Sequence, residues 1–126
     1  MVTYPKGFIY EAKKDPQVVA VVLFGSQARG EAGPLSDLDI AIIAPSLSVE
    51  GRLRLRGYGS ENIDIVFFDE LPLSLKKRIL EEGKILFNKN QRLLDDLLWT
   101  TFKEYLDFGI HRARLIENYL PGVSYV

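Results

Sequence analysis

The chain has 126 residues, with 16 Lys and Arg residues against 17 Asp and Glu residues, no Cys and a single His. This length is enough for one domain, because domains usually contain about 100–150 residues. The absence of Cys excludes disulfides, thiolate nucleophiles and Cys-ligated metal centres, and the single His excludes a His-rich zinc site. A catalytic site here would be built from carboxylates, hydroxyls, Lys and Arg, with a hard metal ion where a metal is needed.

Charge and hydropathy predict a folded cytoplasmic protein. A formal net charge of −1 argues against direct nucleic-acid binding, which normally requires a basic surface. The first 15 residues lack the apolar run of a signal peptide. No apolar run approaches the length of about 18 residues that a membrane span requires, so we expect no membrane partner.

The first third of the sequence predicts a short helix, two strands and the segment that joins them. The helix covers residues 6–15. The apolar run 18–24 (VVAVVLF) predicts a central strand that is buried on both faces. Residues 27–30 can form a short helix, 31–36 contain Gly-Pro and predict a loop, and 37–44 (DLDIAIIA) predict a second strand.

Residues 46–60 predict a loop in which Arg52, Arg54 and Arg56 alternate with leucines. In an extended segment this spacing places the three guanidinium groups on one side. A solvated loop is the favoured interpretation. The alternative is a contact with a triphosphate, an RNA or an acidic partner.

The remaining sequence predicts a strand, a helix, an edge strand and a long final helix. The third strand is 61–68 (ENIDIVFF), and the helix over 72–82 begins at a proline and has Gly83 at its C′ position. A short edge strand covers 85–87, and the long helix covers 91–120. These elements form one α+β domain with a small mixed β-sheet of about four strands flanked by helices.

The predicted C-terminal helix is too long and too apolar to serve this domain alone. Thirty residues span about 45 Å, whereas a globule of this chain length is about 36 Å across. Its apolar residues cover an arc of about 200°, and packing on one sheet needs about 100°. We therefore expect a second partner, a homodimer mate or another protein. A break at Gly109 that folds the end back is the alternative, and His111 is interpreted as a surface residue.

Three aspartates stand out in the predicted strands. Asp37 and Asp39 are two apart, so both side chains point to the same face, and Asp64 lies within an apolar strand, where a buried carboxylate needs a partner. If the strands are neighbours, the three can meet, and each pair at about 5 Å repels by about 3 kcal/mol at an effective dielectric of about 20. Such oxygen ligands predict Mg²⁺ or Mn²⁺. A lone Asp-x-Asp would more often simply begin a strand.

A Gly-Ser pair supplies candidate phosphate ligands. Gly25 and Ser26 follow directly on the buried strand, where backbone N–H groups and the Ser hydroxyl can approach a phosphate. Arg29 lies one turn later and can reach the same phosphates. Alone, a Gly-Ser pair is usually just a turn.

This combination resembles the nucleotidyltransferases of the DNA polymerase β superfamily. Their motif is Gly-Ser, about ten residues, Asp-x-Asp, and a third Asp on a later strand. The short form GSQARGEA ahead of SDLDIAI, and LKKRILEEGKILF after the third Asp, are similar to the minimal nucleotidyltransferase (MNT, MntA-type antitoxin) group. The resemblance covers residues 18–87 and implies a polymerase β-like fold, with a domain core over about 6–88 within a single domain over 1–126.

The resemblance implies a role for each motif residue. Gly25 and Ser26 would hold the β- and γ-phosphates of a nucleoside triphosphate, with Arg29 in support. The Asp-x-Asp pair would ligate two Mg²⁺ ions, and Asp64 would share the metal on the acceptor side and help to deprotonate the attacking hydroxyl. The hydroxyl would attack the α-phosphate in line, and pyrophosphate would leave.

The resemblance also implies a partner. MNT proteins are commonly paired with a HEPN-domain ribonuclease toxin, and their implied activity is transfer of AMP from ATP to a Tyr of that toxin. Two alternatives stay open: an antitoxin that acts by binding alone, and a small-molecule nucleotidyltransferase of the aminoglycoside-modifying type. The sequence leaves open the nucleotide base, the acceptor residue, the number of AMP units and the oligomeric state.

Overall fold

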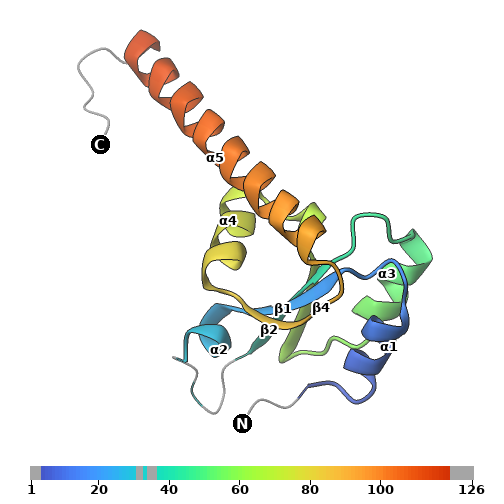
Figure 1. Ribbon diagram of the computed structural model, residues 1–126. Helices are drawn as coiled ribbons and strands as arrows, with labels where there is room; N and C mark the ends of the chain where they lie inside the picture. The colour runs from blue at the N-terminus through green and yellow to red at the C-terminus, as the bar shows by residue number, and fades with distance from the viewer. Residues whose placement is uncertain (1–3, 31–32, 34–36, 120–126) are drawn as a thin grey trace.

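The computed structural model describes residues 4–30, 33 and 37–119, with only the backbone for the last five of these. Its centre is a four-stranded sheet in the order β3-β2-β1-β4 (Figure 1). The β2–β3 pair is parallel, and the other two pairs are antiparallel. The predicted α+β fold with a mixed four-stranded sheet is thus confirmed. The strands are β1 (Ala20–Phe24), β2 (Leu38–Ile43), β3 (Ile63–Phe67) and β4 (Lys84–Asn88).

Helices cover both faces of this sheet. On one face, α1 and α3 pack over a core that includes Phe8, Ile40 and Leu55. On the other face, α4 and the first part of α5 cover a second core around Ile43 and Ile79. The helices are α1 (Phe8–Lys14), α2 (Gly25–Arg29), α3 (Val49–Arg56), α4 (Leu73–Glu82) and α5 (Gln91–Tyr119), with a 3₁₀ turn η1 (Phe68–Glu70).

The central position of β1 explains its continuous apolar sequence. Ala20 and Val22 are buried in one core, and Val21 and Leu23 are buried in the other. The prediction of a strand buried on both faces is confirmed, although the strand begins at Ala20 rather than at residue 18. The predicted edge strand is β4, which closes one side of the sheet.

The predicted loop over 46–60 is wrong, because residues 49–56 form helix α3. The Ser48 hydroxyl caps this helix by accepting a hydrogen bond from the Gly51 backbone N–H at 3.1 Å. The alternation of Leu and Arg suggested an extended strand-like period, but only Leu55 is buried, whereas Leu53 is 62% exposed. Local capping and burial of one leucine therefore override the pattern.

The three arginines of α3 form ion pairs and do not make one exposed row, so that prediction is also wrong. The Arg52 side chain is only 14% exposed, and its guanidinium lies 3.1 Å from Asp69 and 3.2 Å from Glu70. It also donates to the Leu47 carbonyl at 3.0 Å. Arg54 pairs with Asp15 at 2.7 Å. These contacts fasten α3 to η1 and to the residue after α1.

Gly83 ends α4, but not in the left-handed conformation that a C′ glycine usually adopts. Its backbone is extended, with φ −69° and ψ 153°. A β-carbon at this position would overlap the Val22 side chain and the Ile79 carbonyl. The glycine therefore allows close approach of α4 to β1.

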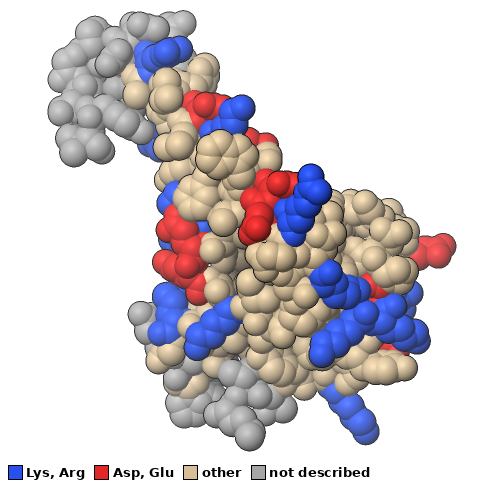
Figure 2. All heavy atoms as spheres, in the orientation of Figure 1, with Lys and Arg blue, Asp and Glu red and all other residues tan. Residues whose placement is uncertain are grey.

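Helix α5 runs without interruption through Gly109, so the proposed break there is wrong. Its first part packs on α4 and buries Leu94, while the rest projects from the body of the molecule (Figure 1). Trp99 is 74% exposed and Leu106 is 64% exposed. Figure 2 shows uncharged side chains between charged ones along this projection. The predicted excess apolar surface is present, and His111 is exposed as expected.

Within the described residues, no helix is both long and apolar enough to cross a lipid bilayer.

Candidate active site

The register of two parallel strands brings two of the predicted aspartates together. Asp39 of β2 is the direct partner of Asp64 of β3, and neighbouring strands lie about 4.8 Å apart. Both side chains therefore point to the same face of the sheet, which is the face that α4 covers further along. Asp37 precedes β2 by one residue and, by the two-residue period, lies on this side as well.

The three carboxylates differ in exposure. Asp39 is half-buried, whereas Asp37 and Asp64 are exposed. The expectation that Asp64 is buried within its apolar strand is wrong, because β3 is an edge strand whose free side is open. An exposed Asp64 carries little desolvation cost and remains accessible to a second substrate.

Electrostatic repulsion acts on the central carboxylate. Burial raises the pKa of Asp39 above its ordinary value, and the charges of Asp64 and then Asp37 raise it further. The nearby Arg29 guanidinium lowers the same pKa. The three carboxylates therefore repel one another, and a bound cation would reduce this repulsion.

Gly25 lies against this carboxylate. Its neighbour Phe24 pairs with Asp39 across the β1–β2 ladder. Gly25 adopts a left-handed φ of 74°, and a β-carbon here would overlap the Asp39 carboxylate. Helix α2 begins at this glycine, two residues earlier than predicted, so Ser26 lies in its first turn.

Arg29 ends α2 and bridges toward α4. Its guanidinium lies 3.6 Å from the Glu82 carboxylate, and both side chains are more than a third exposed. An exposed ion pair of this kind contributes at most about 1 kcal/mol. The Glu82 contact therefore does little to oppose a contact of Arg29 with a phosphate.

The carboxylates share a face without forming a closed metal cage. In the described part of the chain, no three His, Cys, Asp or Glu side chains are gathered as a preformed metal site. The donors present here are nevertheless hard carboxylate oxygens with mutual repulsion, which is the environment that Mg²⁺ and Mn²⁺ prefer.

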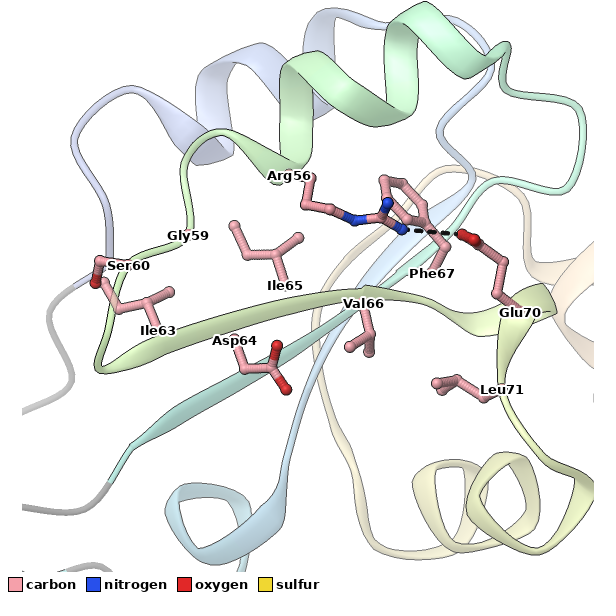
Figure 3. Close-up of a pocket in the computed structure, with 10 residues that line it drawn as sticks. All are labelled: Arg56, Gly59, Ser60, Ile63, Asp64, Ile65, Val66, Phe67, Glu70 and Leu71. Atoms are coloured by element: carbon pink, nitrogen blue, oxygen red, sulfur yellow. Dashed lines mark hydrogen bonds and ion pairs between the residues drawn. The ribbon is translucent and has the colours of Figure 1, made fainter.

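An open cavity of about 490 Å³ runs along the free side of β3 (Figure 3). Asp64 forms part of its wall, so the cavity reaches one of the three carboxylates. Sequence reasoning singled out Arg56 for its charge but missed this cavity and the contributions of Ser60 and Glu70, because no local pattern in residues 61–68 indicates an edge strand. The lining consists of Arg56, Gly59, Ser60, Ile63, Asp64, Ile65, Val66, Phe67, Glu70 and Leu71.

Comparison with known proteins identifies the fold family. The family model described as polymerase beta, nucleotidyltransferase matches residues 8–92. The chain belongs to this family. All six motif residues discussed above lie within the matched range.

Relatives agree with this assignment. A Methanocaldococcus jannaschii protein provisionally named a protein adenylyltransferase is 31% identical over 77 residues, which cover 61% of this chain and 62% of that protein. The chain thus matches less than two thirds of the relative's length.

Solved structures share the fold at lower identity. A chain of a toxin–antitoxin complex with AMP-PNP superimposes with a TM-score of 0.69 at 23% identity, covering 89% of this chain and 95% of that chain. A chain of the complex between tri-AMPylated HEPN toxin and MNT antitoxin from Shewanella oneidensis gives 0.61 at 21% identity, covering 88% and 97%.

Proposed function

We propose that this protein is a Mg²⁺-dependent nucleotidyltransferase that transfers AMP from ATP to a hydroxyl of a partner protein, as the cytoplasmic antitoxin of a HEPN-domain toxin. The observation that carries the proposal is the pairing of Asp39 with Asp64, with Gly25 against the Asp39 carboxylate. This arrangement supports binding of a phosphate next to a metal ion. The names of the relatives described above support the same activity.

The nucleotide would bind at the start of α2. The Ser26 hydroxyl and the neighbouring backbone N–H groups donate to the terminal phosphates, which approach closely because Gly25 has no side chain. Arg29 adds a positive charge once it exchanges Glu82 for phosphate. These contacts orient the α-phosphate toward the aspartates.

Asp37, Asp39 and Asp64 would hold Mg²⁺. The fit rests on their oxygen donors and on the repulsion that raises the Asp39 pKa. When bound, the metal supplies charge neutralisation at the phosphates and lowers the pKa of the attacking hydroxyl.

Asp64 would act on the acceptor side. Its exposed carboxylate accepts the proton of the acceptor hydroxyl, whose oxygen forms a bond to the α-phosphorus while the bond to pyrophosphate breaks. The products are an AMP ester of the acceptor and pyrophosphate. The protein contributes mainly orientation and a fixed arrangement of charges.

The exposed apolar surface of α5 would hold the partner. Trp99, Leu106 and Ile110 are more than half exposed, and they lie on a helix that projects from the domain (Figure 1). The same surface supports two further possibilities: an antitoxin that acts by binding alone, and a homodimer. Light scattering of the purified protein, alone and with a HEPN protein, separates the homodimer from the complex.

The test is transfer of α-labelled AMP to a co-purified HEPN protein in the presence of Mg²⁺. We expect label on the HEPN protein with the wild type and with Glu50→Gln, an exposed acid of α3, but not with Asp39→Asn. Nucleotide binding is followed in parallel by calorimetry. Neutralisation of the toxin by Asp37→Asn and Asp39→Asn variants as effectively as by wild type would favour the binding-only antitoxin. Absence of Mg-ATP binding by the folded wild type would reject the enzymatic function.

A further inference from the structure

We propose that an extended segment of the acceptor protein binds along the free edge of β3 as an added strand, and that this places its hydroxyl side chain beside Asp64. The inference rests on the proposed transfer reaction and specifies how the acceptor is held. The first observation is the shape of the cavity beside β3, which is lined by all five residues of the strand. Because successive side chains point to opposite faces, only a cavity centred on the edge can touch all five.

The backbone of this edge has hydrogen-bonding groups available. The Leu38 N–H donates to the Asn62 carbonyl at 2.9 Å, so the polar groups of even-numbered residues here point toward β2. Ile63 points the other way and exchanges hydrogen bonds with Ser60. By this alternation, the N–H and C=O of Ile65 and the N–H of Phe67 point into the cavity. No described strand pairs with β3 on this side.

The length of the edge defines the bound segment. The turn at Gly59 and Ser60 closes one end, and Glu70 and Leu71 close the other (Figure 3). The five residues of β3 span about 17 Å. This length accommodates four or five extended residues, whose backbone groups would bind in the way that peptides extend a sheet edge.

The side-chain positions select for a hydroxyl. A residue of the added strand that faces the Asp64 side would have its β-carbon about 4.5–5.5 Å from that of Asp64. A Ser or Thr directly opposite brings its hydroxyl to the carboxylate, and the longer Tyr side chain reaches it from a diagonal position. Val66 and Leu71 line the cavity near Asp64, Val66 on the same face of β3, and favour an apolar residue two positions from the hydroxyl.

The charges of the cavity favour a neutral or basic segment. Arg56 lies on the opposite face, 5.0 Å above the Phe67 ring, and pairs with Glu70 at 3.1 Å. Its charge is therefore offset by Glu70, whereas Asp64 adds a further negative charge. Glu70 also pairs with Arg52 at 3.2 Å. An acidic segment would therefore be repelled mainly by Asp64, and a flanking Lys or Arg would be attracted mainly to Asp64.

The first test narrows the cavity at one end. Ser60 is exposed and contributes only backbone groups to its bridge with Ile63, so Ser60→Trp should fold normally while filling the cavity. Glu61→Trp is the matched control, because Glu61 is exposed, adjacent and outside the cavity lining. We expect Ser60→Trp to lower kcat/KM for the HEPN acceptor at least tenfold, with unchanged melting temperature and AMP-PNP affinity. Glu61→Trp should behave as wild type, and an unchanged kcat/KM in Ser60→Trp would overturn the proposal.

The second test examines the backbone and does not need catalysis. A library of nine-residue peptides with one central Ser, Thr or Tyr is screened for binding, and hydrogen exchange of the Ile65 and Phe67 amides is followed by NMR. We expect at least tenfold slower exchange at both amides with the tightest peptide. Alternate amides of the bound peptide would point toward β3 or away from it. N-methylation of the amides that point toward β3 should abolish binding, and N-methylation of the others should not. Binding without protection of these amides, equal effects of both methylation sets, or no binding peptide would each reject strand addition. Protection of the amides without AMP transfer by wild type would instead reject the proposed function and retain the binding mode.

Discussion

The helices cover one face of the sheet more completely than the other. On the face covered by α1 and α3, Ile40 and Ile42 of β2 are fully buried, and Arg52 fastens α3 to η1. On the opposite face, α4 and α5 cover Ala41 and Ile43 but leave the end that carries Asp39 only half-buried. Alternate residues of one strand thus supply stability on one face and candidate chemistry on the other. Substitutions on the two faces should therefore separate stability from activity.

The largest expected effect is the loss of transfer in Asp39→Asn. Removing the carboxylate that faces Asp64 should lower kcat for AMP transfer by about 10³-fold, because electrostatic stabilisation is lost at the reacting phosphate. Steady-state transfer of labelled AMP measures the effect. A loss smaller than tenfold would place the chemistry elsewhere.

On the face covered by α1 and α3, Leu55→Ala should lower stability without changing the rate of AMP transfer. Leu55 is fully buried under α3, so its truncation should lower the free energy of unfolding by about 2–5 kcal/mol. Urea denaturation measures this change, and transfer is assayed where the variant is still folded. The matched control is Leu53→Ala on the same helix, whose side chain is 62% exposed; a change above about 0.5 kcal/mol there would contradict the assignment of the two leucines.

Gly25→Ala should lower both the stability of the fold and the affinity for the nucleotide. The left-handed backbone and the overlap with the Asp39 carboxylate predict a loss of about 1–2 kcal/mol of stability together with weaker nucleotide binding. Calorimetry with AMP-PNP and thermal denaturation measure the two effects. Gly30→Ala is the control, since it has a similar φ of 73° but open space around it. Equal nucleotide affinity in both variants would show that Gly25 is not needed at the phosphates.

The Asp39→Asn variant should also be more stable than wild type without metal at pH 7. Burial and the charges of Asp64 and Asp37 raise the pKa of Asp39 in the folded state above its ordinary value of 3.8. Between the ordinary pKa of Asp39 in the unfolded chain and its raised pKa in the folded state, the folded protein binds more protons than the unfolded protein. Its stability therefore falls as the pH rises through this interval.

The size of this gain should depend on pH. We expect a gain of about 0.5–1 kcal/mol above the folded-state pKa, limited by solvent screening, and none below the unfolded-state pKa. Urea denaturation in EDTA at pH 3 and pH 7 measures it. A gain that is equal at both pH values would show that charge is not its cause.

The smallest effect on stability should come from Trp99→Ser on the projecting helix. Trp99 is 74% exposed, so the free energy of unfolding should change by less than about 0.5 kcal/mol. The affinity for the HEPN partner should nevertheless fall at least tenfold, because exposed Trp residues often dominate interfaces. Isothermal titration of the two proteins measures this, and Arg92→Ser, an exposed residue at the start of α5, is the control.

Much of the fold followed from local patterns, and the exceptions have physical reasons. The apolar run of β1 predicted a central strand because burial on both faces removes every polar position. Residues 49–56 were predicted to be a loop because the alternation of Leu and Arg has the period of an extended strand. They form a helix because Ser48 caps its start and Leu55 is buried in the core. Gly83 was expected to adopt the usual left-handed backbone conformation of a helix C-terminus. A glycine is needed there instead because a side chain would overlap Val22, which is distant in sequence.

By itself, the sequence determined that Asp37 and Asp39 share a face, because the two-residue period of a strand is a local property of the backbone. It also carried the Gly-Ser and Asp-x-Asp spacing that identifies the family. Only the tertiary structure decided that Asp64 stands opposite Asp39, and that β3 is an open edge with a cavity beside it. Strand order and register depend on packing between distant segments, and no local pattern in residues 61–68 indicated that this strand lies at an edge of the sheet.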